Sequence, residues 1–364
     1  MKNILKVCAG IFLVAVCGSV IATGVINTQY SDKVSDRVKR YENKIAEIEK
    51  TIENEKKKDT SDNEDKENVL IAGQYQIADT TKISDAYKNG KPDGLDESEK
   101  ETYDLASKLL KKIIKDGMSD YEKEKAIYEW LVTNVPHDME GRPEDVSTPR
   151  GVLKGKKAVC VGYATTFRLL ANMVGLECKV MHDTSEGHSW DLCKLDDGKW
   201  YITDCYMDAG DVSYASFNMV DEHAKKAGHS WDASLFPRAD GTKYSYAIMN
   251  AKKVEDSMKI INKVSKLFSK EVEKAEVCSF AVDNNDKKNL CKANYIYEGI
   301  ESRFDYTGKS LISFKFDNKT YYAYFRFKAS LNEDTPVVDF DTTKYDGMLD
   351  KNFGEIKEGD NYAG

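Results

Sequence analysis

The sequence has no cluster of charge of one sign. Its 364 residues include 54 lysines and arginines against 62 aspartates and glutamates, and the two signs are interspersed along the chain. A surface that binds nucleic acid needs basic side chains gathered on one face. The formal net charge of −8, without a basic cluster, argues against that class of function. We expect no nucleic acid or other polyanion among the partners.

The sequence also lacks the spacings by which proteins commonly hold a metal ion, such as Cys-x-x-Cys or His-Glu-x-x-His. A zinc site formed by Cys160, His182 and His188 is the metal-binding alternative for this chain, but neither of these spacings supports it. We therefore expect neither a metal nor another cofactor.

Charge is absent from most of the N-terminal segment. After Lys2 and Lys6 the next charged residue is Asp32, and the apolar run between them is long enough to cross a bilayer as a helix. Residues 1–30 are therefore predicted to be a signal anchor, which would hold the protein in the cell membrane by a single pass with its bulk outside the cytoplasm. The alternative is a signal peptide cleaved after Ala22, which would give a secreted protein.

Residues 31–68 separate this segment from the folded part. An apolar seam with alternating spacings of four and three runs through Val34, Val38, Tyr41, Ile45, Ile48 and Ile52. The seam predicts a parallel coiled-coil stalk, with a homo-oligomer through residues 34–52. Because the seam is shorter than the ~3–4 heptads typical of coiled coils, a solvated single helix is the alternative. The charged stretch that follows, residues 56–68, has no apolar anchors and predicts a disordered linker.

A folded domain is predicted over residues 69–240. Apolar residues at helical spacing predict a helix over residues 96–115, and Ser119 with Glu122 predicts a capping box that opens a second helix. Residues 137–157 then contain two prolines and several charges. They are predicted to form either the rim of a substrate cleft or an ordinary surface connection.

A cysteine opens the helix around which this domain is organised. After Cys160, apolar residues recur at helical spacing as far as Val174, and Gly175 follows at the position of a C-terminal cap. The unpaired N–H groups and the positive end of the dipole at a helix start favour a thiolate, which is the nucleophilic form of cysteine. Cys160 is therefore the candidate nucleophile.

A histidine and an aspartate flank a predicted β-hairpin farther along the chain. Strands are predicted over residues 177–181, 189–195 and 199–203. If the turn is Asp196-Asp197-Gly198, the register places His188 opposite Tyr206 and makes Asp204 its diagonal neighbour on the same face. A nucleophile at a helix start, a base, and an acid that orients the base form the arrangement needed for acyl transfer through a thioester.

Three motifs surround these residues in order: Val159-Cys160-Val161-Gly162-Tyr163-Ala164, His188-Ser189-Trp190 and Trp200-Tyr201-Ile202-Thr203-Asp204. Over about residues 119–232 the chain resembles the transglutaminase-like superfamily of papain-type folds. The resemblance implies an α+β core in which the nucleophile helix packs on an antiparallel sheet, with Cys160, His188 and Asp204 as the catalytic triad. Substrate contacts are then expected from Trp190, Tyr163 and Tyr206.

The chain departs from many members of that family after Asp204. Their pattern Asp-x-Thr-Trp-Asp is here Asp204-Cys205-Tyr206-Met207-Asp208, which changes the expected shape of the site and keeps the triad. Farther on, His229 with Trp231 and Asp232 resembles the segment that ends such domains. His229 is expected to be structural.

Residues 241–345 are predicted to form a small α+β appendage, and residues 346–364 a polar tail. The expected elements are a helix over 252–268, a strand over 277–282, a helix around 289–300 and a hairpin of strands over 311–316 and 320–327. Cys278 and Cys291 are the first pair to consider for a disulfide in an exported protein. Cys178 and Cys193 are expected to be buried thiols.

The sequence thus predicts an exported, membrane-anchored cysteine enzyme that acts on a protein or peptide, including cell-wall peptide. Within the family, bacterial members with a compact core look more like hydrolases than crosslinkers, so a peptidase or amidase is favoured over a protein-glutamine transferase. One alternative is a catalytically inactive surface module that binds peptide or wall polymer, for which Cys160 would be unreactive. Another is a structural stalk protein that depends on residues 34–52.

Overall fold

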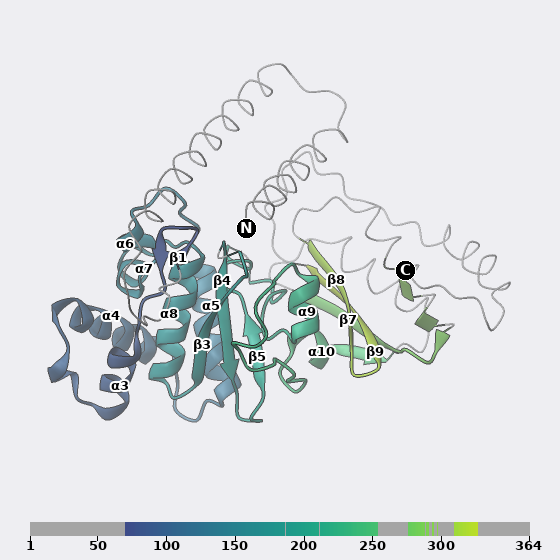
Figure 1. The fold of residues 1–364 in the computed structure, drawn as a ribbon. Helices are drawn as coiled ribbons and strands as arrows, with labels where there is room; N and C mark the ends of the chain where they lie inside the picture. The colour runs from purple at the N-terminus through teal and green to yellow at the C-terminus, as the bar shows by residue number, and fades with distance from the viewer. Residues whose placement is uncertain are drawn as a thin grey trace, which may run out of the picture. The chain divides into compact units, whose positions relative to one another are not determined.

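The computed structural model describes residues 70–253, apart from 186 and 211, together with 276–287, 289–290, 293–294, 297 and 309–326 (Figure 1). The predicted signal segment (1–30), the stalk and linker (31–68) and the polar tail (346–364) lie outside the described residues. Among the helices that are described, none combines the length and the apolar character that a membrane span requires.

Two helices with complete capping boxes precede the nucleophile. Helix α4 (Glu97–Ile113) begins after Asp96, which accepts from the N–H of Glu99 at 2.9 Å, and the Glu99 carboxylate accepts in return at 2.8 Å. Helix α5 (Asp120–Asn134) begins at Ser119, and its predicted box with Glu122 is confirmed. Each box satisfies N–H groups that have no partner within the helix. Upstream lie β1 (Leu70–Ile71), β2 (Tyr75–Gln76), α3 (Thr81–Asn89) and the 3-10 helix η1 (Pro92–Gly94).

Residues 137–157 are more regular than the surface connection that the sequence suggested. They contain α6 (Pro143–Val146) and α7 (Pro149–Gly155), each with proline at its first position, where the missing N–H costs nothing. The nucleophile helix packs on the end of α6 so closely that a Cβ added at Gly162 would lie 2.0 Å from the carbonyl oxygen of Val146. This surface segment therefore supports the start of the nucleophile helix, and its place at the rim of a substrate cleft stays a prediction.

Helix α8 (Cys160–Met173) begins at the candidate nucleophile and packs on a three-stranded antiparallel sheet (Figure 1). The sheet has the order β3 (Glu177–His182), β4 (Ser189–Lys194) and β5 (Trp200–Thr203). Asp191 pairs with Thr203 and Lys194 with Trp200, and Leu195 donates to the carbonyl of Lys199. The turn is therefore residues 196–198, as predicted. Gly175 follows α8 with φ of +92°, the conformation expected of a C-terminal cap.

Alternating side chains on this sheet face two different cores. One set, which includes Cys193 and Tyr201, packs with residues of α5 and α8. The other set, which includes Trp190 and Ile202, packs with residues of the segment around α9 (Asp221–Lys226). His188 and Asp204 share the parity of the second set, since side chains alternate along a strand. The two candidate catalytic residues therefore meet at one end of the sheet.

A second, four-stranded sheet packs on α9 and on α10 (Tyr246–Met249). Its order is β6 (Ala251–Lys253), β7 (Glu276–Asp283), β9 (Lys319–Arg326) and β8 (Lys309–Phe316). One apolar cluster includes Val220, Ala247 and Phe314, and His223 of α9 stacks on Phe314 with ring centroids 4.8 Å apart. Apolar contacts thus join the two sides of the predicted boundary at residue 240.

Two predictions for the appendage are confirmed and one is wrong. The strand at 277–282 and the hairpin are present, and the hairpin turn is the pair Asp317 and Asn318, both with positive φ, as a two-residue type I′ turn requires. The helix predicted from residue 252 is wrong at its start, because residues 252 and 253 continue β6 and pair in parallel with β7. The remainder, residues 254–268, lies outside the described residues, as do Cys291 and most of residues 289–300.

Candidate active site

Cys160 is the first residue of α8, as its position in the sequence predicted. Its N–H belongs to the first turn, where no carbonyl of the helix is available to accept it. The side chain is 8% exposed and packs in an apolar cluster with Ile71, Tyr75 and Val146, against which Tyr206 also lies. The N-terminal hairpin thus contributes two neighbours of the cysteine that no motif identified.

His188 and Asp204 lie side by side, as the hairpin register predicted. The Nε2 atom of His188 is 2.7 Å from Oδ2 of Asp204, whose side chain is 1% exposed. The other carboxylate oxygen accepts from the N–H of Met207 at 3.1 Å. Because Nε2 is engaged with the carboxylate, Nδ1 is the ring nitrogen left for proton transfer with a thiol.

The electrostatics of the pair favour its charged form. Burial works against a charge on His188, but the Asp204 carboxylate and the Cys160 thiol outweigh burial and raise the pKa of His188 from 6.5 to about 10. Burial likewise opposes the charge on Asp204, and the imidazoles of His188 and His229 outweigh it, so that the pKa of Asp204 is held below its ordinary value. At neutral pH the pair is an imidazolium beside a carboxylate.

A second aspartate fixes the loop that leads to His188. Oδ1 of Asp183 accepts from the N–H of Gly187 at 2.7 Å and from the N–H of His188 at 3.2 Å. The Asp183 N–H donates to the carbonyl of His188 at 3.1 Å, which closes the loop. None of the three motifs includes Asp183, although an aspartate that accepts from N–H groups just ahead of it is a recognised turn signal.

The three residues expected to contact substrate occupy different environments. Tyr163 and Trp190 are each 1% exposed, and the Tyr163 hydroxyl donates to the carbonyl of Val135. Their burial favours a packing role over direct contact with a substrate. Tyr206 is partly exposed and lies 5.4 Å from His188 between ring centroids, so it is the one of the three placed to meet a substrate.

Tyr206 is held by residues that follow α5. The His137 ring stacks on it with centroids 4.2 Å apart, and Nε2 of His137 is 2.8 Å from the carbonyl oxygen of Tyr206. The Tyr206 hydroxyl is 3.8 Å from the sulfur of Met139, which is 65% exposed. Met207 is 56% exposed. An aromatic and apolar surface therefore lies beside His188.

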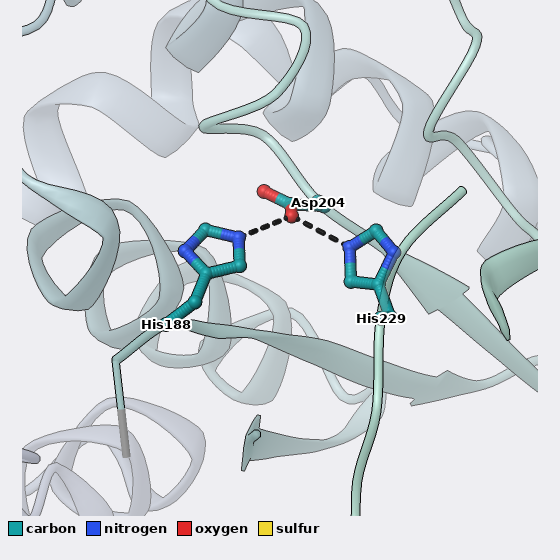
Figure 2. Close-up of side chains that lie close together, drawn as sticks. All are labelled: His188, Asp204 and His229. Atoms are coloured by element: carbon teal, nitrogen blue, oxygen red, sulfur yellow. Dashed lines mark hydrogen bonds and ion pairs between the residues drawn. The ribbon is translucent and has the colours of Figure 1, made fainter. Parts of the chain in front are cut away.

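A further histidine contacts the same carboxylate. Nε2 of His229 is 2.8 Å from Oδ2 of Asp204, and Figure 2 shows the rings of His188 and His229 on either side of that oxygen. The sequence predicted a structural role for His229 and no place in the site. A signal was present, because the tetrapeptide His-Ser-Trp-Asp occurs twice, at 188–191 and at 229–232. The two copies lie near one another, with ring centroids 6.0 Å apart for His188 and His229 and 6.1 Å apart for Trp190 and Trp231.

The spacing of this cluster suits hydrogen bonds better than a metal ion. Among the described residues, His188, Asp204 and His229 offer ligand atoms that lie within 4.8 Å of one another. Tetrahedral zinc with bonds of about 2.0–2.1 Å keeps its ligand atoms about 3.3 Å apart. The Nε2 atoms of both histidines are 2.7–2.8 Å from Oδ2 of Asp204, which is the distance of a hydrogen bond. His182, part of the zinc alternative, instead has its Nδ1 3.1 Å from the carbonyl oxygen of Asp183.

Residues 107–205, which contain Cys160, His188 and Asp204, match the family model of the transglutaminase-like superfamily. The chain carries a transglutaminase-like domain. The resemblance found in the three motifs is thereby confirmed, as is the α+β core of nucleophile helix and antiparallel sheet. His229 lies outside the residues that the family model matches.

The transglutaminase-like domain is distantly similar to two curated proteins. Kyphoscoliosis peptidase from Mus musculus is 24% identical over 133 residues, and that from Homo sapiens is 23% identical over 119 residues. The matches cover 31% and 28% of this chain but only 20% and 18% of the relatives, so the chain spans about a fifth of their length. A crystal structure of a TGase is similar over 47% of this chain and 44% of that one, at 19% identity and a TM-score of 0.28.

Proposed function

We propose that the protein is a cysteine acyl-transfer enzyme that forms a thioester at Cys160. The observation that carries the proposal is the contact of 2.7 Å between His188 and the buried Asp204, together with the interaction of His188 with Cys160 at the start of a helix. A buried ion pair is expensive to maintain, so its position beside a nucleophile favours a catalytic role.

The geometry supports a role for each group in the proposed reaction. In the reactive form the Cys160 proton already lies on Nδ1 of the His188 imidazolium, and the sulfur anion attacks the carbonyl carbon of a carboxamide or peptide. The negative charge that develops on the carbonyl oxygen is stabilised by the unpaired N–H of Cys160. His188 gives its proton to the leaving nitrogen, which departs as ammonia or an amine and leaves a thioester. Water or an amine then attacks the thioester and gives a proton to His188, and the sulfur leaves as the anion beside the imidazolium, which restores the reactive form.

We further propose that the acyl group comes from a protein or peptide and passes mainly to water. The curated relatives carry the name of a peptidase, which supports hydrolysis. The partly exposed Tyr206 and the exposed Met139 and Met207 would offer an apolar surface to a substrate side chain beside the reacting carbonyl. Apolar area of this kind favours binding of apolar or aromatic side chains.

The products distinguish a hydrolase from a transferase. Peptide libraries are incubated with the protein, with and without a primary amine, and the products are identified by mass spectrometry, with Cys160→Ala as the control. A cleaved backbone means a peptidase, release of ammonia without a new bond means an amidase, and a new amide to the added amine means a transferase. A full set of products from Cys160→Ala would contradict the proposal. A wild-type protein that binds peptide without turnover and has an unreactive Cys160 would favour the binding module.

The location of the enzyme is a separate proposal that depends on the sequence alone. The apolar run within residues 1–30 supports retention in the cell membrane with the enzyme outside, and self-association through residues 34–52 would add a second anchor per assembly. Protease treatment of intact cells should remove the enzyme domain. Mature chain free in the medium, starting after Ala22, would mean secretion instead.

A further inference from the structure

His229 makes two hydrogen bonds, both to groups that only accept. Its Nε2 is 2.8 Å from Oδ2 of Asp204, and its Nδ1 is 3.1 Å from the carbonyl oxygen of Ala224. A carbonyl oxygen has no proton to give, and neither has an ionised carboxylate. The bond to the Asp204 carboxylate therefore requires a proton on Nε2 of His229, and this nitrogen is the donor.

The position of His229 leaves it no route to a substrate. Its side chain is 3% exposed, and its ring lies 4.7 Å from that of the buried Trp190 at an interplanar angle of 79°. His229 therefore acts on the reacting groups through its hydrogen bond to Asp204, without contact with a substrate.

We propose that His229 is a positioning residue of the active site, which fixes the Asp204 carboxylate for His188 by donating a hydrogen bond to the same oxygen. Oδ2 of Asp204 accepts from both rings, and Oδ1 accepts from the N–H of Met207, so three donors fix the plane of the carboxylate. This inference rests on the proposed function, since it assigns a role within the same site.

Two substitutions test the hydrogen bond. His229→Phe removes it, and the loss of a hydrogen bond to a charged group should lower kcat about 10- to 100-fold. KM should stay within about twofold, because the ring does not reach the substrate. His229→Gln keeps an N–H that can reach Asp204 and should restore most of kcat.

His223→Phe is the matched control. His223 is also a buried histidine of the α9 region, it stacks on Phe314, and among the described residues its Nδ1 has no hydrogen-bond partner. A phenylalanine preserves that stack, so this variant should keep the wild-type rate and pH profile. Circular dichroism and thermal melting of all three variants report whether they fold.

The decisive experiment measures the rate at which iodoacetamide labels Cys160 across pH, together with turnover, in wild type, His229→Phe, His229→Gln and His223→Phe. We expect slower labelling and turnover in His229→Phe, recovery of both in His229→Gln, and no change in His223→Phe. The inference is wrong if His229→Phe keeps both kcat and the labelling rate, or if His229→Gln folds but does not recover kcat. Turnover that survives in Cys160→Ala would refute the proposed function instead. The labelling rates would still test whether His229 affects the reactivity of Cys160.

Discussion

Raising the pH should destabilise the folded protein through His188. The pKa of His188 is raised from 6.5 to about 10 in the folded state, so between these values the folded protein holds a proton that the unfolded chain has released. The stabilisation is therefore complete below pH 6.5 and is lost as the pH rises through about 10. At about 1.4 kcal/mol per pH unit, the rise from 6.5 to about 10 gives a ceiling of about 5 kcal/mol.

Urea unfolding of wild type and His188→Gln at half-unit steps from pH 6 to pH 10 measures this contribution. Ionisation of tyrosines and lysines is common to both proteins, so it cancels in the difference between their unfolding free energies. We expect wild type to be the more stable at pH 6 and its advantage to shrink steadily towards pH 10. Two curves that stay parallel across this range would refute the ion pair between His188 and Asp204.

Three other substitutions test the surroundings of the site. Burial raises the pKa of Glu124 from 4.5 to about 8. Between these values the unfolding free energy of Glu124→Gln should rise relative to that of wild type by up to about 1.4 kcal/mol per pH unit, and a difference that stays constant in urea unfolding would contradict this. Gly162→Ala should lower the unfolding free energy by about 1–3 kcal/mol, measured by thermal unfolding, because its Cβ would lie 2.0 Å from the carbonyl oxygen of Val146. Gly155→Ala is the matched control, since a Cβ there meets nothing within 4 Å. Ser119→Ala should lower the unfolding free energy by about 1 kcal/mol through loss of the capping box, and an unchanged urea midpoint would speak against the box.

Local chemistry made the core of the site predictable. The cap at Gly175 and the apolar spacing after Cys160 placed the nucleophile at a helix start, and α8 begins there. Strand parity, together with a three-residue turn, was enough to predict that His188 lies beside Asp204. Both inferences use only the few residues on either side, which is why they needed no knowledge of the wider fold.

Contacts between segments far apart in the chain were not predictable in this way. His229 follows α9 and reaches Asp204 because α9 packs on the face of the sheet that carries Trp190, and the sequence encodes that packing only as scattered apolar residues. Tyr75 comes to Cys160 from the N-terminal hairpin for the same kind of reason. The strand at residues 251–253 was missed because a parallel pairing with β7 has no local signature.

The central claim is that an acyl group is carried on the sulfur of Cys160. The most direct measurement is to quench a reaction with peptide substrate in acid within milliseconds to seconds and map the protein by mass spectrometry. The account predicts an added acyl mass on the peptide that contains Cys160, which hydroxylamine removes as a hydroxamate, and its absence from Cys160→Ala. Turnover with no acyl mass on Cys160 at any time point, and equal turnover by Cys160→Ala, would contradict it.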